Sequence, residues 1–202
     1  MAILADWKTL AEELSRYARL CYDRRLVGAA GGNVSARIPG RDLALITATG
    51  VSLRDVGPAN LLVVDLQGGV VENPAGLRPS KETGFHLGIY RARAEVRAVV
   101  HVHPTYATVY SNLRIPVPLA TVSAEHKLRQ GPVVRAAAGG SGALEALLLE
   151  SVAVAPTANV FLMEGHGLTA FGPSLCEAFD DAELAEDTAK IAFLVGMARP
   201  GA

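Results

Sequence analysis

Residues 96–104 read VRAVVHVHP, and this stretch decides how the rest of the chain is interpreted. The run is short, apolar and rich in valine, and Pro104 stops it, a combination typical of a buried β-strand. Successive side chains of a strand point to opposite faces of a sheet, so His101 and His103 share one face. The stretch therefore predicts a strand over 96–103 that presents two imidazoles together at its end.

Helices and strands alternate loosely on both sides of this strand. Apolar residues at helical spacing predict helices over 5–27, from about Lys81 to Ala92, and over 105–113, 142–151 and 174–198. Short apolar or β-branched runs predict strands at 42–47, 61–66 and 158–165, with further candidates around 119–122 and 133–138. This order favours a layered α/β fold. Since no linker divides residues 1–202, we expect a single domain.

The composition excludes several classes of protein. The chain has 202 residues, of which 50% are hydrophobic, and a formal net charge of -1. That balance argues against a nucleic-acid or membrane partner, both of which attract clustered positive charge. Cys21 and Cys176 are too few and too far apart for a disulfide scaffold, and the sequence shows neither a signal peptide nor a membrane span. We expect a cytoplasmic protein.

Three places hold residue types that carry chemistry. The pair His101 and His103 suits a divalent transition metal, although backbone carbonyls satisfying both rings would explain it equally well. Glu82 follows Ser80 at the start of a helix, where an acid and an N-capping serine are favoured on structural grounds alone. His166 stands between two glycines at a strand end, a position typical of a ligand or catalytic group.

Two glycine-rich segments are candidates for anion binding. They are GAAGGNVSAR at 28–37 and TATG at 47–50. Such turns expose backbone N–H groups, and Asn33, Ser35 and Thr49 add side-chain donors. Neither segment is a P-loop or a dinucleotide fingerprint, and a plain loop after a helix explains 28–37 as well.

Other reactive residue types have structural interpretations. His86, one helical turn after Glu82, is interpreted as a packed helix-face residue, and Cys176 as part of the core. The acidic residues of the last helix are interpreted as a solvated face; they are Asp180, Asp181, Glu183, Glu186 and Asp187.

In this order, GGNVS, TATG, PSKE, HVHP and EGHGL resemble the motifs of the class II aldolase/adducin family, and most closely its L-fuculose-phosphate aldolase-like sugar-phosphate aldolases. Each motif is weak alone, but five in one order are specific, and the resemblance runs from about Leu14 to Leu194. It implies a three-layer α/β/α sandwich with a central, mainly antiparallel sheet. It also implies one divalent metal per chain, most often zinc, with manganese or cobalt as alternatives.

The resemblance also assigns roles to residues. His101, His103 and His166 correspond to the metal-binding histidines, and Glu82 to an acid that ligates the metal and acts as the base once substrate displaces it. The positions corresponding to the substrate phosphate site are Asn33, Thr49, Gly50, Ser80 and Lys81. In the aldolases a second serine is frequent where this chain has Lys81. PSKE also resembles decarboxylases acting on 3-oxo-sugar-acid phosphates, and a solvated lysine is the structural alternative.

The implied activity is cleavage of a ketose 1-phosphate to dihydroxyacetone phosphate and an aldehyde, through a metal-stabilised enediolate. Decarboxylation of a 3-oxo-sugar-acid phosphate and sugar-phosphate epimerisation reuse the same chemistry. An adducin-like scaffold without chemistry is the non-enzyme alternative, and the complete set of four candidate ligands argues against it. The family usually forms homotetramers with active sites at subunit interfaces, with which a mean hydropathy of +0.26 is compatible.

One part of the aldolase machinery is missing from the expected place. The fuculose-phosphate aldolases use a tyrosine near the middle of the chain to protonate the aldehyde oxygen, and residues 115–127, IPVPLATVSAEHK, contain none. Tyr106, His126 or water are the alternatives. Packing in the core is the simpler interpretation of Tyr106, and surface exposure that of His126.

Overall fold

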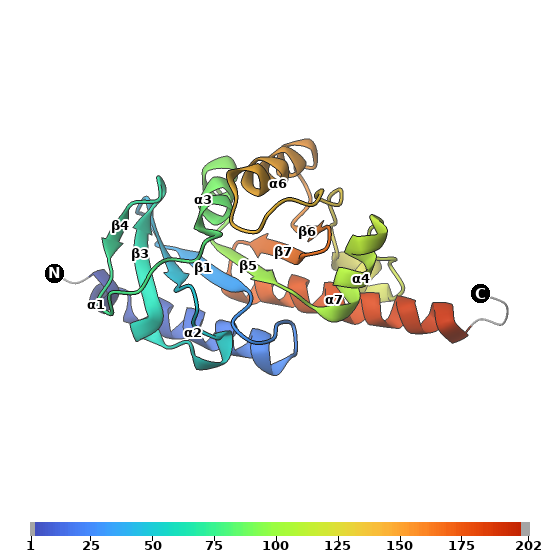
Figure 1. Cartoon of the computed structure of the whole chain (residues 1–202), viewed down its shortest axis with the longest axis horizontal. Coiled ribbons are helices and arrows are strands. Elements are labelled where there is room, and N and C mark those ends of the chain that lie inside the picture. The colour runs from blue at the N-terminus through green and yellow to red at the C-terminus, as the bar shows by residue number, and fades with distance from the viewer. Residues whose placement is uncertain (1–2, 199–202) are drawn as a thin grey trace.

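A computed structural model describes residues 3–198 of the chain, and a seven-stranded sheet runs through its centre (Figure 1). The spatial order of the strands is β4-β3-β2-β1-β5-β7-β6, and every neighbouring pair among these strands is antiparallel. Their bounds are β1 Asn33–Arg37, β2 Leu43–Thr47, β3 Leu61–Asp65, β4 Val70–Glu72, β5 Ala98–Val102, β6 Val160–Met163 and β7 Gly167–Gly172.

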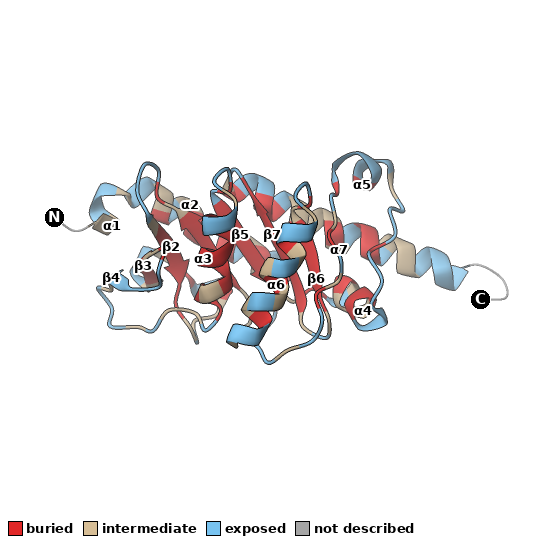
Figure 2. Cartoon of the chain, turned by 90° about the horizontal axis from the view of Figure 1, so that it is seen from above, coloured by how far each residue is buried: buried red, intermediate tan, exposed pale blue. Residues whose placement is uncertain are grey.

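Helices cover both faces of the sheet. Figures 1 and 2 show α3 and α6 on one face and α2 and α7 on the other, with the buried residues between these layers. Two hydrophobic clusters, one on each side of the sheet, correspond to these faces. The three-layer α/β/α sandwich is therefore confirmed. The helix bounds are α1 Ile3–Asp6, α2 Lys8–Asp23, α3 Thr83–Ala92, α4 Thr105–Leu113, α5 Val122–Lys127, α6 Gly142–Val154 and α7 Leu175–Ala198, with 3-10 turns at Leu53–Asp55 and Pro58–Asn60.

The interior strand β5, which lies between β1 and β7, divides its side chains between the two faces of the sheet. Val100 and its alternate neighbours pack into the cluster under α2 and α7, whereas Val99 packs into the cluster under α3 and α6. His101 lies on the α3 side, where its ring meets that of Phe85 edge-on at a centroid distance of 5.4 Å. The expected strand over 96–103 is thus confirmed, two residues shorter at its start and one at its end.

Three strands were not predicted from the sequence. Residues 33–37 of the expected glycine-rich loop form β1, which pairs with β2 and β5, and β4 and β7 are also additional. The polar side chains of Asn33 and Ser35 point to the α3 side, so β1 lacks the apolar pattern of a buried strand. Their partners are groups from α3, which are far away in sequence.

Two expected strands are wrong. Val122 of the expected strand at 119–122 begins α5 instead, because the Thr121 hydroxyl accepts the backbone N–H of Ala124 at 3.1 Å and caps a helix. The segment 133–138 makes only an isolated parallel bridge, between Val134 and Met163 of the edge strand β6.

The first helix is shorter than expected. It is divided into α1 and α2, and α2 ends at Asp23 rather than near residue 27. Arg25 has a φ of 61°, in the left-handed region that ends a helix, and the chain then turns inward to bury Leu26.

Cys176, expected in the core, is exposed on α7. Among the described helices, none combines the length and the apolar composition that a membrane crossing needs.

Candidate metal centre and its cleft

The carboxyl end of β5 is where the candidate residues meet. His101 lies near the end of the strand, with Asn33 of β1 opposite it on one side and Thr169 of β7 on the other. His103 follows directly after the strand. Glu82 occupies the N-cap position of α3, the helix that packs on this face of the sheet. The sheet and α3 therefore bring together segments that are far apart in sequence.

His166 reaches the same place through a tight turn between β6 and β7. Its backbone N–H donates to the carbonyl of Met163 at 3.0 Å, and the flanking Gly165 has a φ of 67°. Gly167 has a φ of 156°, and a Cβ there would lie 2.3 Å from the carbonyl oxygen of Val102. Only glycine fits this close approach to β5, which explains why His166 stands between two glycines.

The four candidate ligands converge. One ring nitrogen from each of His101, His103 and His166 lies within 4.8 Å of the others. The Nε2 atoms of His101 and His103 are 2.9 Å apart. The two oxygens of Glu82 lie 3.2 Å from His101 Nε2 and 3.2 Å from His166 Nε2. These are the residues for which a metal-binding role was expected.

The electrostatics fit a cation at this point. His101 Nδ1 donates to the Leu168 carbonyl at 3.0 Å, so its Nε2 faces the cluster as a lone-pair donor. Burial, together with the neighbouring His103 and His166, holds the pKa of His101 well below its usual range. Burial likewise lowers the pKa of His103. Neutral imidazole nitrogens with one carboxylate form a donor set that suits zinc and related divalent metals.

A cleft of about 230 Å³ opens beside these ligands. Its lining includes Glu82, His103 and His166, whereas His101 is fully buried beneath it. All five residues expected at the phosphate site also line it: Asn33, Thr49, Gly50, Ser80 and Lys81. Gly139 and Gly140, in a loop that faces these residues, also line the cleft, and no local pattern in the sequence links that loop to it.

The start of α3 differs slightly from the expected cap. The Ser80 hydroxyl accepts the backbone N–H of Glu82 at 3.2 Å, one turn before the helix, which begins at Thr83. The side-chain amide of Asn33 donates to Glu82 Oε2 at 2.8 Å. Hydrogen bonds to its backbone N–H and to its carboxylate therefore fix the position of Glu82.

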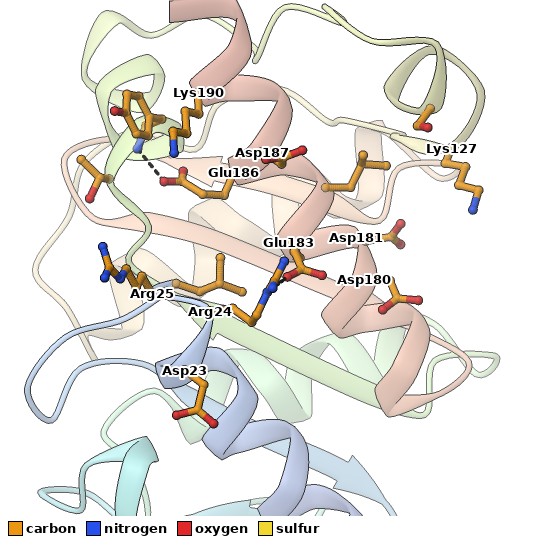
Figure 3. Close-up of a pocket in the computed structure, with 15 residues that line it drawn as sticks. Asp23, Arg24, Arg25, Lys127, Asp180, Asp181, Glu183, Glu186, Asp187 and Lys190 are labelled. Atoms are coloured by element: carbon orange, nitrogen blue, oxygen red, sulfur yellow. Dashed lines mark hydrogen bonds and ion pairs between the residues drawn. The ribbon is translucent and has the colours of Figure 1, made fainter. Parts of the chain in front are cut away.

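A larger cleft, of about 860 Å³, lies on the other helical layer, between α7, the end of α2 and the start of α4 (Figure 3). Of the acidic residues interpreted as a solvated face, Asp180 and Asp187 are exposed as expected, whereas Asp181, Glu183 and Glu186 are half-buried. Glu183 pairs with Arg24, and Glu186 accepts the backbone N–H groups of Tyr106 and Ala107 at 3.0 and 2.8 Å, capping α4. Burial, with the charge of Asp180, raises the pKa of Asp181 to about 6. We interpret these groups as structural.

The two alternative proton donors do not line the cleft beside Glu82. Tyr106 lines the larger cleft, where its ring lies 5.6 Å from that of Phe193. His126 is exposed on α5. The expected exposure of His126 is confirmed, whereas Tyr106 is half-buried against the core rather than within it. Within one chain, neither side chain is in place to protonate a product of the smaller cleft.

Comparison with known proteins connects this site to a family. Residues 12–193 match the family model for the class II aldolase and adducin N-terminal domain. An L-fuculose phosphate aldolase of Methanococcus maripaludis is 30% identical over 91% of this chain and 96% of its own. A 3-oxo-tetronate 4-phosphate decarboxylase of Escherichia coli K12 is 33% identical over 94% of this chain and 88% of its own. A solved L-fuculose 1-phosphate aldolase superposes with a TM-score of 0.81 at 28% identity, covering 94% of this chain and 88% of that one.

Proposed function

Because this chain belongs to the class II aldolase and adducin family, we propose that it is a metal-dependent lyase that cleaves a ketose 1-phosphate to dihydroxyacetone phosphate and an aldehyde. The observation that carries the proposal is the convergence of three histidine nitrogens within 4.8 Å, with the Glu82 carboxylate 3.2 Å from two of them. A relative named as a fuculose phosphate aldolase, aligned over 91% of this chain, supports the substrate class.

In this proposal, His101, His103 and His166 hold the cation and Glu82 completes the set in the resting site. When bound, a divalent cation supplies Lewis-acid stabilisation of negative charge on a substrate oxygen, worth several kcal/mol. In the cleavage direction, the hydroxyl of the carbon that becomes the aldehyde gives up its proton, which passes through water to Glu82, and Glu82 delivers a proton to the carbon next to the carbonyl after the carbon–carbon bond breaks. In the reverse direction Glu82 removes the proton from that carbon, and it passes through water to the oxygen of the aldehyde. The phosphate is held at the mouth of the cleft by Ser80, Thr49 and the glycine-rich turns.

A second candidate reaction is decarboxylation of a 3-oxo-sugar-acid phosphate. The 33% identical relative named as a decarboxylase favours it, as does Lys81 at the edge of the cleft. The ligand set is common to both reactions, and to an epimerase, because each forms a negative charge next to a carbonyl. A test therefore measures metal content first, and then release of dihydroxyacetone phosphate and of carbon dioxide from a panel of both substrate classes. Protein that holds no metal and turns over neither class would favour the scaffold alternative.

The Lys81 ammonium group is proposed to bind the substrate phosphate. Replacing Lys81 with serine is expected to raise KM for phosphorylated substrates by about tenfold, because one charge-assisted hydrogen bond is lost. We expect kcat to change little. Steady-state kinetics with a phosphorylated substrate and its unphosphorylated analogue would check this. If both substrates respond alike, or neither responds, Lys81 is a solvated lysine at the start of a helix.

We also propose that residues 1–202 form one domain that assembles as a homotetramer in the cytoplasm, with active sites at subunit interfaces. Two groups of exposed apolar side chains support assembly. Leu113, Ile115, Leu119 and Val122 lie on the α4–α5 segment, and Leu194, Val195 and Met197 on the last turns of α7. Figure 2 shows α4 and α5 beside α7, near the end where that helix extends past the sheet. Clustered exposed apolar surface is typical of interfaces.

Sedimentation equilibrium is expected to give a mass about four times the 21.1 kDa of the chain. Val122→Asp should lower that mass, because a charge at a buried interface costs several kcal/mol when unpaired. Val154→Asp is the matched control, since Val122 and Val154 are both 69% exposed and Val154 lies on α6. A monomeric wild-type chain, or equal effects of the two substitutions, would contradict the proposed interface.

A further inference from the structure

A line of four buried polar side chains runs from the core to Glu82. The Tyr90 hydroxyl lies 2.7 Å from the Ser35 hydroxyl, which lies 2.7 Å from His86 Nδ1. His86 Nε2 lies 2.5 Å from Asn33 Oδ1, and Asn33 Nδ2 donates to Glu82 Oε2 at 2.8 Å. Tyr90, Ser35, His86 and Asn33 are at most 4% exposed. We name this line the α3–β1 relay.

The relay is built from two regular spacings that face each other. Glu82, His86 and Tyr90 are four residues apart along α3 and its N-cap, so they share one helical face. Asn33 and Ser35 are two residues apart on β1 and share one face of the sheet. Because these two faces pack against each other, side chains of α3 and β1 alternate along the relay. His86 is therefore the packed residue that the sequence predicted, but its ring is joined to the metal centre.

The chemistry of the end groups fixes the direction of every hydrogen bond. The Glu82 carboxylate accepts only, so the Asn33 group facing it is the NH₂, and Asn33 Oδ1 must face His86. That oxygen also accepts only, which requires a proton on His86 Nε2. His86 Nδ1 is then the acceptor for the Ser35 hydroxyl, and the Ser35 oxygen accepts from Tyr90. The imidazole is thereby restricted to one neutral tautomer.

We propose that His86 is a positioning residue for Glu82, acting through Asn33. This inference rests on the proposed role of Glu82 as ligand and base. By donating from Nε2, His86 stops the Asn33 amide from rotating and keeps its NH₂ directed at Glu82 Oε2. The carboxylate then stays aligned between His101 and His166. Asn33 is the direct hydrogen-bond partner of the proposed ligand, and partners of that kind usually tune a metal site; His86 acts one hydrogen bond further away, by fixing Asn33.

The surroundings of His86 keep it in this role across a wide pH range. Burial, together with the nearby His101, lowers the pKa of His86 to about 3. The ring is stacked against Phe85 at a centroid distance of 4.9 Å, and its exposed fraction is 0%. A protonated ring would place a second donor against the Ser35 hydroxyl and a charge in the core.

The first test compares two substitutions. His86→Leu removes the donor and is expected to lower kcat by about 10- to 100-fold with KM changed far less. His86→Gln retains an N–H donor toward Asn33 and is expected to stay within about threefold of wild type. Leu87→Ala, a buried neighbour on α3, controls for lost packing alone and should lower the melting temperature without the fall in kcat. Equal losses in the two His86 variants, or a fall in kcat for Leu87→Ala as large as that for His86→Leu, would overturn the proposal.

The second test does not depend on turnover. Nitrogen NMR of the ¹⁵N-histidine-labelled wild-type chain reports which ring nitrogen carries the proton, and Nε2 is expected for His86 near pH 7. A proton on Nδ1, or on both ring nitrogens, would contradict the hydrogen bonds assigned to the relay, whether or not the protein is active. Absence of metal and of turnover in the wild type would instead refute the proposed function, so the two failures are distinguishable.

Discussion

His101→Ala is expected to remove the bound metal and to lower turnover by about a thousandfold or more. The ring is fully buried, and its Nε2 lies 2.9 Å from that of His103 and 3.2 Å from the Glu82 carboxylate. Losing a Lewis acid that stabilises negative charge by about 4 kcal/mol corresponds to about three factors of ten in rate. Elemental analysis of the purified variant and a discontinuous assay for dihydroxyacetone phosphate would measure both effects.

The matched controls separate metal loss from misfolding. His166→Ala removes a proposed ligand whose side chain is 21% exposed, so the variant should lose metal with little cost in stability. His126→Ala changes an exposed histidine of α5 and should retain both metal and activity. A His101→Ala protein that still holds one metal per chain would contradict the assigned ligands.

Glu82→Gln is expected to keep the metal and to lose most of the rate. The substitution preserves size but removes the base, and general-base catalysis is worth about 10²- to 10⁴-fold. Because the three histidines remain, metal content should be close to that of the wild type, and KM should change less than kcat. Glu125→Gln, on the exposed face of α5, is the control carboxylate. Unchanged kcat in Glu82→Gln would show that the proton is moved by another group.

The sequence predicted those parts of the fold whose signals are local. The valine-rich run of β5 and the periodic apolar positions of α2, α3 and α7 carry their own evidence. The strand β1 does not, because Asn33 and Ser35 are polar residues that point inward, and burial is favourable for them only beside His86 and Glu82. The strand β7 is completely buried, but it begins and ends with a glycine, so its sequence lacks the continuous apolar run from which a buried strand is predicted.

The candidate site was predictable to a similar extent. The order of the motifs indicated Glu82 and the three histidines as candidate ligands, and in the structure these four side chains converge. The relay was not predicted, although its spacings are visible in the sequence. A four-residue spacing in α3 and a two-residue spacing in β1 become one line of hydrogen bonds only when that helix packs on that strand.

The proposed metal ligands come from segments around residues 82, 101 and 166, so the candidate centre is made of contacts that are remote in sequence. Such contacts are costly to form, because closing long loops costs entropy before any contact is gained. An ion held by all three segments would bind only chains in which β5 already lies between β1 and β7. Metal affinity and folding stability would then be linked, and a chelator would act on this chain as a mild denaturant.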